Sequence, residues 1–458
     1  MITISLFEAV AAIGGRVNKQ ISPTAYINQI THNSNEVSSG GLFVAIKGER
    51  VDGHDFVKGA EEQGAIAVVV EREVEGLDIP QVIVPSSLEA LGGLSKLWRF
   101  RCAIPIVAVT GSVGKTTTKE LTAHVLSGKF TTHKGRKNYN NELGVPLELL
   151  RLQPVDECSV VEFGMRGTNQ INYLAKIARP TVGIITNIGV SHIELLGTRE
   201  NIAHAKSEIL EGIDSQGAIV LNRDDDFFEL ISKKANCKVV SFGENSSADV
   251  VISDITLDDN AHPSFKLNGI AINMKNVAGR HHAFNAAAAY TAAKQLGVSD
   301  EVIVAQIESF EAPEKRGHIT KLANQALLLD STYNAAPDSI KASLFTLDEI
   351  AENANRAIAV VGDMLELGDY SKEAHSHVGK VISEMKTTLD VLVTVGDNAR
   401  FIAEKANAKA NKHFENSSQA ATYISEELSD KDAILIQGSN GIKLNKVVDA
   451  LKDKFGEV

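Results

Sequence analysis

The chain has 458 residues, too many for one hydrophobic core, and this length indicates two to four domains. Its 43% hydrophobic and 23% charged residues are typical of a soluble globular protein, and a formal net charge of −12 argues against a general binder of nucleic acid or anionic membranes. Three widely spaced cysteines suggest neither a disulfide framework nor a zinc site, and neither a signal peptide nor a membrane-length apolar run is recognised, so we expect a cytoplasmic protein without membrane insertion.

The first block of the chain predicts a small α/β domain. Apolar runs of strand length occur at 42–46, 65–70 and 81–85, and a helical stretch begins near Asp55. The third run ends in a proline, which indicates a domain boundary. We therefore place this domain at residues 1–84.

The second and third blocks alternate strand and helix signals, which predicts doubly wound parallel sheets. A polar, β-rich insertion at about 249–275 and an Ala-rich helix close the second block, and 311–317 has the composition of a linker. The expected domains are 85–312 and 313–458. Strands are expected at 104–109, 159–164, 181–189, 217–222 and 238–243 in the second block, and at 326–330, 356–363, 391–396 and 433–439 in the third.

The stretch "TGSVGKTT" at 110–117 predicts a phosphate site between a strand and a helix. Backbone N–H groups of such a turn converge on a phosphate, Lys115 adds positive charge, and the Thr116 hydroxyl can ligate Mg²⁺. The general Walker A pattern fails because Val109 stands where it requires glycine, so the match is to a shorter variant. The alternative is a turn whose glycines only change the direction of the chain. That alternative does not explain the lysine, because a cation at a helix N-terminus is unfavourable without an anion. The residues of this site are Thr110, Gly111, Ser112, Val113, Gly114, Lys115, Thr116 and Thr117.

Further candidates follow the neighbouring strands. Glu162 ends an apolar strand and could ligate Mg²⁺, although a partly solvated strand end is the alternative. Asn187 and His192 lie in a loop at the same edge of the sheet, where a lone histidine is more often structural. From the residues alone, Lys206 looks like an exposed helix lysine.

Polar residues also gather at two other places. The amide-rich "YNNELGVP" at 139–146 indicates polar recognition, and "DSTYNAAPDS" and "GDMLELGD" follow strands of the third block, where open α/β sheets bind ligands. Each of these side chains could instead be an N-cap or turn residue. The candidates are Asn140, Asn141, Glu142, Asp330, Tyr333, Asn334 and Asp363.

Taken in order, these stretches resemble the Mur ligases of peptidoglycan synthesis. The resemblance rests on "GLFVAIKGERVDGHDFVKGAEEQGA", "TGSVGKTTTKEL", "NYNNELGVPLELL", "EFGMRG", "TNIGVSHIELLGT", "AKSEI" and "DSTYNAAPDS" with "VVGDMLELG", and it covers essentially the whole chain. It implies a UDP-sugar domain, an ATP domain and a Rossmann-like domain that helps close the site. The implied reaction joins D-alanyl-D-alanine to UDP-N-acetylmuramoyl-tripeptide: ATP phosphorylates the terminal carboxylate, the dipeptide amine attacks the acyl phosphate, and phosphate leaves.

The resemblance also implies roles for single residues, in a monomeric enzyme that uses ATP and two Mg²⁺ ions. Lys115 would be the phosphate cation, Thr116 and Glu162 would ligate the first ion, and His192 would ligate the second together with a carbamylated Lys206. Matches to nucleotide-binding positions are Asn187, Asn285, Arg316, Asp330 and Tyr333. Expected substrate-binding residues are Ser34, Lys47, Asn140, Asn141, Glu142, Asn334 and Asp363.

Several positions depart from the family pattern, mainly in substrate-binding loops, while the phosphate and metal set is intact. The stretch "HNSNEV" at 32–37 stands where the family pattern has an acidic residue, a serine and an arginine. The other departures are His282, Ser331, Ala336, Gln437 and Asn440.

Three other functions stay open. The family member that adds the third amino acid of the peptide usually has Asp-Asn-Pro-Arg, which "VGDNAR" at 395–400 approaches with Ala399 in place of the proline. A folylpolyglutamate synthase is a weaker alternative. A nucleotide-controlled switch that ligates nothing would need neither the amide-rich stretch nor a third domain.

Overall fold

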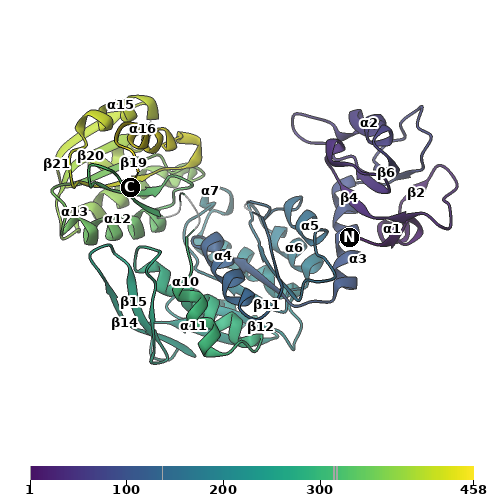
Figure 1. Cartoon of the computed structure of the whole chain (residues 1–458), viewed down its shortest axis with the longest axis horizontal. Helices are drawn as coiled ribbons and strands as arrows, with labels where there is room; N and C mark the ends of the chain where they lie inside the picture. Colours follow the sequence, from purple (N-terminus) through teal and green to yellow (C-terminus); the bar gives the residue numbers. More distant parts are fainter. Residues whose placement is uncertain (1, 137, 313–314, 316–317, 458) are drawn as a thin grey trace. The chain divides into compact units, whose positions relative to one another are not determined.

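The structure, a computed structural model, describes residues 2–136, 138–312, 315 and 318–457 (Figure 1). The chain forms two compact units. The first comprises Met1–Ala108, Phe130–Gly183 and Glu208–Gly217, and the second comprises Val109–Lys129, Ile184–Ser207 and Ala218–Val458. The predicted domain boundaries at 84 and 312 stay a prediction. Among the described helices, none is both long enough and apolar enough to cross a bilayer.

A five-stranded sheet in the order β2-β7-β6-β5-β4 organises the N-terminal part of the first unit. Its strands pair in parallel except at β2, and the apolar run of β6 is buried between neighbours, as expected for a central parallel strand. The three predicted strands are confirmed. The strands are β2 (Arg16–Val17), β4 (Gln29–Thr31), β5 (Gly41–Val44), β6 (Ala65–Val70) and β7 (Gln81–Ile83), beside a separate antiparallel pair of β1 (Ile4–Ser5) and β3 (Tyr26–Ile27).

Two helices of the first unit begin at clear capping signals. In α1 (Leu6–Ile13), Ser5 and Glu8 form a reciprocal capping box, and the helix ends at Gly14 in the left-handed conformation. Ser86 caps α3 (Ser87–Cys102), which packs against α1, α5 and α6. The remaining helical segments are α2 (Val57–Glu62), α5 (Gly144–Leu149), α6 (Gln170–Ala178) and the 3₁₀ turns η1 (Ser34–Glu36), η2 (Gly53–Phe56) and η3 (Glu208–Gly212).

The central sheet has nine strands in the order β16-β15-β14-β13-β12-β11-β8-β10-β9. Its predicted strands are all present, but the sheet is mixed, because the polar insertion adds β15 and β16 as antiparallel strands at one edge. The strands are β8 (Ile106–Thr110), β9 (Thr132–Lys134), β10 (Cys158–Glu162), β11 (Val182–Ile185), β12 (Ala218–Asn222), β13 (Lys238–Gly243), β14 (Val250–Leu257), β15 (Pro263–Leu267) and β16 (Ile270–Asn273).

The Ala-rich helix α10 (His281–Gln295) is buried in the second unit. It packs against α4 (Lys115–Ser127), the helix that follows the phosphate loop, and over β12, β13 and β14. Its alanines are almost completely covered, which lets the backbones approach closely. The other helices here are α7 (Ile193–Leu196), α8 (Arg199–Ser207), α9 (Phe228–Ser232) and α11 (Asp300–Glu308).

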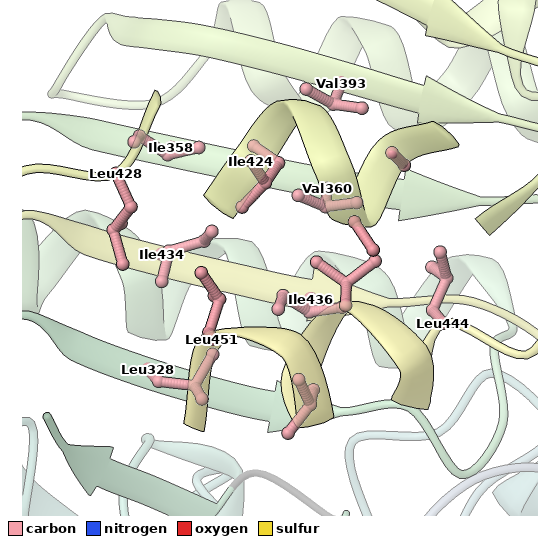
Figure 2. Packing of buried hydrophobic residues seen from close by; sticks show 14 of the residues in the cluster. Leu328, Ile358, Val360, Val393, Ile424, Leu428, Ile434, Ile436, Leu444 and Leu451 are labelled. Carbon is pink, nitrogen blue, oxygen red and sulfur yellow. The ribbon is translucent and has the colours of Figure 1, made fainter. Parts of the chain in front are cut away.

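A six-stranded sheet in the order β17-β18-β22-β19-β20-β21 forms the C-terminal part of the second unit. All pairs are parallel except β17 with β18. Figure 2 shows Ile424 over β19, near Ile358 and Val360, in the hydrophobic core of this sheet. The strands are β17 (His318–Lys321), β18 (Leu327–Ser331), β19 (Ala357–Gly362), β20 (Leu389–Val395), β21 (Ala408–Phe414) and β22 (Ala433–Gln437). The helical segments are α12 (Pro337–Ala351), η4 (Gly368–Tyr370), α13 (Ser371–Ser383), α14 (Arg400–Ala403), α15 (Ser417–Glu427), η5 (Asn440–Ile442) and α16 (Asn445–Phe455).

Candidate active site

The loop between β8 and α4 is built to hold an anion. β8 is buried along its length, and α4 begins at Lys115 directly after Gly114, which has φ 82 and gives the helix no side-chain cap. The first N–H groups of a helix lack partners within the helix and carry the positive end of its dipole, so they favour a negative ligand. The strand, turn and helix predicted from the sequence are therefore confirmed, with the helix beginning at the predicted lysine.

Position 111 of this loop has no room for a side chain larger than that of glycine. It has φ 146, and a Cβ atom placed on it would lie 1.9 Å from the Oγ1 atom of Thr186. The Thr186 hydroxyl donates a hydrogen bond of 2.6 Å to the carbonyl oxygen of Val113, so it cannot move aside without loss. A side chain at position 111 would therefore disturb both the loop and the end of β11.

We expect Gly111→Ala to lower the free energy of unfolding by about 2 to 4 kcal/mol and to weaken ADP binding, because the new methyl group displaces Thr186. Urea unfolding and calorimetric titration with ADP measure the two effects. Gly59→Ala is the matched control, because a Cβ atom on Gly59, in helix α2, meets no atom within 4 Å. Equal stability of the two variants would contradict the steric argument.

Two lysine side chains meet on one carbonyl oxygen of the loop. The Nζ atom of Lys115 donates to Gly111 O at 2.7 Å and to Ser112 O at 3.0 Å, and Lys206 Nζ donates to the same Gly111 O at 2.9 Å. Lys206 is 1% exposed, and its burial, together with the charge of Lys115, lowers its pKa well below the usual lysine value. The expectation of an exposed helix lysine at position 206 is wrong. The Lys115 ammonium group and the uncapped N-terminus of α4 together favour an anionic ligand.

The segment after β11 is bonded to the loop. The side chain of Asn187 accepts from Val113 N at 3.0 Å and donates to Val113 O at 2.9 Å. Farther along, Gly189 N donates to the Ser112 hydroxyl at 2.8 Å. From the other side, Asn285 on α10 accepts a 3.2 Å hydrogen bond from the Thr118 hydroxyl. The structure thus brings both predicted asparagines to the phosphate loop.

His192 lies in the same electrostatic environment as the two lysines. Burial lowers the pKa of its imidazole to about 4, the charges of Lys115 and Lys206 contribute in the same direction, and Glu366 opposes them. Its Nδ1 atom lies 2.8 Å from Glu366 Oε2. Glu366 was not selected from the sequence, although "GDMLELGD", the motif that contains it, was.

In the first unit, Glu162 and the amide-rich stretch are linked. Glu162 is 4% exposed, and its Oε1 atom accepts a 2.8 Å hydrogen bond from Asn140 Nδ2. Asn141 is a local turn residue, because its side chain accepts from Gly144 N at 2.8 Å at the start of α5. Glu142 is partly buried beside it. The pairing with Asn140 holds the Glu162 carboxylate in a defined orientation.

A cavity of about 740 Å³ in the first unit is lined mostly by polar groups. Its wall includes His32 and Asn33, beside the predicted Ser34, while the predicted Lys47 is exposed elsewhere in this unit. The Nδ1 atom of His32 is buried without a hydrogen-bond partner among the described residues. The sequence interpretation missed the basic groups that also line the cavity, namely His133, Arg136 and Arg151, which are scattered around the amide-rich stretch.

The third-block candidates lie at strand ends, as predicted, but two of them are engaged locally. Asp330 accepts from the N–H and hydroxyl of Thr332, and Asp363 accepts from Asn398 N and Ala399 N. Asp330 thus shapes its own loop, whereas Asp363 ties the end of β19 to the segment between β20 and α14. Tyr333 is half-buried and Asn334 is exposed, while Arg316 lies outside the described residues.

Several of the departures from the family pattern are buried. Both ring nitrogens of His282 on α10 lack a hydrogen-bond partner among the described residues, and burial lowers its pKa. Gln437 donates to the Ser339 hydroxyl at 3.1 Å, and that same hydroxyl accepts from the N–H of Ala336. Ser331 lies 3.3 Å from the Ser343 hydroxyl, and Asn440 begins η5.

Within the described residues, no three His, Cys, Asp or Glu side chains form a group that could hold a metal ion. Mg²⁺ usually keeps several waters and is held by one or two protein ligands and by substrate phosphates. Thr116, in the second unit, and Glu162, in the first, each have a side-chain oxygen of the kind that Mg²⁺ binds.

Comparison with known proteins shows to which family the chain belongs. A curated relative from Synechocystis, a UDP-N-acetylmuramoyl-tripeptide--D-alanyl-D-alanine ligase, is 37% identical to this chain over 94% of it and 93% of the relative. The chain belongs to the Mur ligase family. Three family models match this Mur ligase: the catalytic domain at 26–99, the middle domain at 109–293 and the glutamate ligase domain at 315–440.

Solved structures share the fold of this Mur ligase. MurF from Acinetobacter baumannii has a TM-score of 0.91 and 33% identity, covering 99% of this chain and 100% of that one. MurF from Thermotoga maritima, solved in complex with ADP, has a TM-score of 0.83 and 28% identity, covering 93% and 97%. The α/β fold and the family resemblance predicted for this Mur ligase are confirmed.

Proposed function

We propose that this Mur ligase joins D-alanyl-D-alanine to UDP-N-acetylmuramoyl-tripeptide in peptidoglycan precursor synthesis, with hydrolysis of ATP to ADP and phosphate. The observation that carries the proposal is the full-length likeness to ligases with this activity, which extends through all three matched segments. The anion site at the start of α4 supports it, because such a reaction transfers a phosphoryl group.

Two steps make up the reaction. A carboxylate oxygen of the tripeptide attacks the γ-phosphorus of ATP, giving an acyl phosphate and ADP. The amine of D-alanyl-D-alanine then attacks the acyl carbon, and phosphate leaves as the amide bond forms and the amine loses a proton. Lys115 and the N–H groups of α4 stabilise charge on the transferred phosphoryl group, while Asn187 and Asn285 fix the loop that holds it.

Lys206 is proposed to be carbamylated. A lysine with a strongly lowered pKa is partly a neutral amine, and such an amine adds CO₂ to give a carbamate and one released proton. The product carries negative charge beside the ammonium group of Lys115, which stabilises it. Of two Mg²⁺ ions, the first would be held by Thr116 and Glu162 and the second by His192 and the carbamate. Both ions would neutralise the charge of phosphate oxygens during transfer.

The cavity of the first unit is proposed to hold the UDP part of the precursor. Its volume suits a ligand of that size, and Arg136 and Arg151 supply positive charge for a diphosphate. The unpartnered Nδ1 atom of His32 is available for a polar group of the ligand. We further propose a monomer that acts in the cytoplasm.

An acceptor screen tests the function. With ATP, Mg²⁺ and the UDP-muramoyl tripeptide, we expect D-alanyl-D-alanine to be used at least about a hundredfold better than lysine or meso-diaminopimelate, measured by phosphate release and product mass. The selectivity is expected because a site shaped for a dipeptide leaves polar groups unpaired when a single amino acid binds. A preference for a single amino acid with the dipeptide precursor would identify the ligase of the preceding step, and ATP hydrolysis independent of any acceptor would indicate a switch.

A further inference from the structure

The loop that carries Glu366 meets the segment that carries His192 inside the second unit. His192 and Glu366 both have left-handed backbone conformations, with φ 64 and φ 62, which non-glycine residues seldom adopt. The side chains of these two residues approach to 2.8 Å, which indicates that the surrounding structure fixes both positions.

Neighbouring contacts hold the two segments in this arrangement. Gly368 packs so closely on Glu194 that a Cβ atom on it would lie 2.8 Å from the Glu194 Cγ atom. On the other flank, Gly189 would place a Cβ atom 2.3 Å from Asp338 Oδ2. Glycine at both positions permits the close approach. The segment 189–192 is therefore held between the phosphate loop and the C-terminal part of the chain.

We propose that Glu366 is a positioning residue that orients the His192 imidazole toward the phosphate loop. A carboxylate beside Nδ1 keeps the ring proton on that nitrogen, so that the lone pair of Nε2 is available on the opposite side of the ring. This inference rests on the proposed function, because it assigns His192 a role toward the nucleotide and its Mg²⁺.

The contact between His192 and Glu366 also joins two segments of the second unit that are far apart in the chain. His192 lies on the segment bonded to the phosphate loop, whereas Glu366 lies in the loop after β19 of the six-stranded sheet. A correctly placed imidazole thus requires the C-terminal sheet to be in position. Glu366 would therefore make the response to nucleotide depend on the C-terminal part of the chain.

The test replaces the carboxylate while keeping the backbone. Glu366→Gln removes the charge, and Glu366→Asn does so with a residue that adopts the left-handed conformation more readily. ADP binding is titrated calorimetrically at increasing Mg²⁺ concentrations. We expect both variants to need about tenfold to a hundredfold more Mg²⁺ than the wild type to reach half of the maximal enhancement of ADP affinity. Glu373→Gln, at an exposed position on α13, is the matched control and should behave as wild type.

A double-variant cycle separates positioning from a general structural effect. If Glu366 acts through His192, Glu366→Gln should cause no further loss when His192 is already alanine. Independent, multiplicative losses, or an unchanged Mg²⁺ dependence in both single variants, would overturn the inference. The acceptor screen is a separate measurement. If the protein ligates the dipeptide but the losses in the two single variants multiply in the double variant, only the role of Glu366 is refuted. If no dipeptide-dependent ADP release occurs, the proposed function is refuted.

Discussion

Lys115→Ala is expected to reduce ligation by about a hundredfold to a thousandfold or more while leaving the fold intact. The ammonium group lies at the mouth of the anion site, where it would compensate charge on the transferred phosphoryl group, and it contributes little to core packing. ADP release in the presence of D-alanyl-D-alanine measures the loss, and thermal unfolding checks the fold.

Lys129→Ala is the matched control for this experiment. Lys129 lies just beyond the other end of α4 and donates to the carbonyl oxygen of Gly297, so its removal takes away a lysine without touching the phosphate loop. We expect near-normal turnover for this variant. Unchanged ATP turnover in a correctly folded Lys115→Ala protein would show that this loop is not the reaction site.

Lys206→Ala is expected to lose most activity, and so is Lys206→Arg. Arginine keeps a positive charge but has no amine that could form the carbamate, and its larger guanidinium must fit where Lys206 is 1% exposed. Short carboxylates or bicarbonate should partly restore the alanine variant, because they can replace the missing anionic group. Steady-state ADP release with and without added acetate measures the rescue.

A direct measurement complements this pair of variants. Native mass spectrometry under CO₂ should detect an increase equal to one CO₂ in the wild type and none in Lys206→Ala. Lys234→Ala serves as a control, because Lys234 donates to the Ser207 hydroxyl next to Lys206 and should leave the carbamate intact. Near-normal turnover of Lys206→Arg would instead show that a cation suffices at this position.

The fold was predictable wherever the pattern was strong. Apolar runs such as "AIAVVV" and "AILIQGS" became β6 and β22 because a strand buried on both faces must be apolar along its whole length. The polar strand β21, with the sequence AKANKHF, was not predicted, because it lies at a sheet edge where most of its side chains remain exposed. Short strands such as β2 also escape detection, since two residues show no periodicity.

The parts of the candidate site that are formed by short, continuous stretches of sequence were predictable. The phosphate loop and the motif segments are local, so the sequence indicated them directly. The meeting of Lys115 and Lys206 on one oxygen, and of His192 with Glu366, depends on segments far apart in the chain. Burial decided the rest: Lys206 has the spacing of a surface lysine, and tertiary packing alone makes it an unusual base.

The shared carbonyl of Gly111 has a consequence for the design of inhibitors. Lys115 and Lys206 both donate to this oxygen, but burial lowers the pKa of Lys206 and its proposed carbamate would be negatively charged, so Lys115 is the cation that an inhibitor meets. A neutral, weakly accepting heterocycle would leave the Lys115 ammonium group poorly solvated, whereas a phosphonate or carboxylate isostere would satisfy it. Medicinal chemistry aimed at this loop should therefore begin with anionic fragments and address their uptake into cells afterwards.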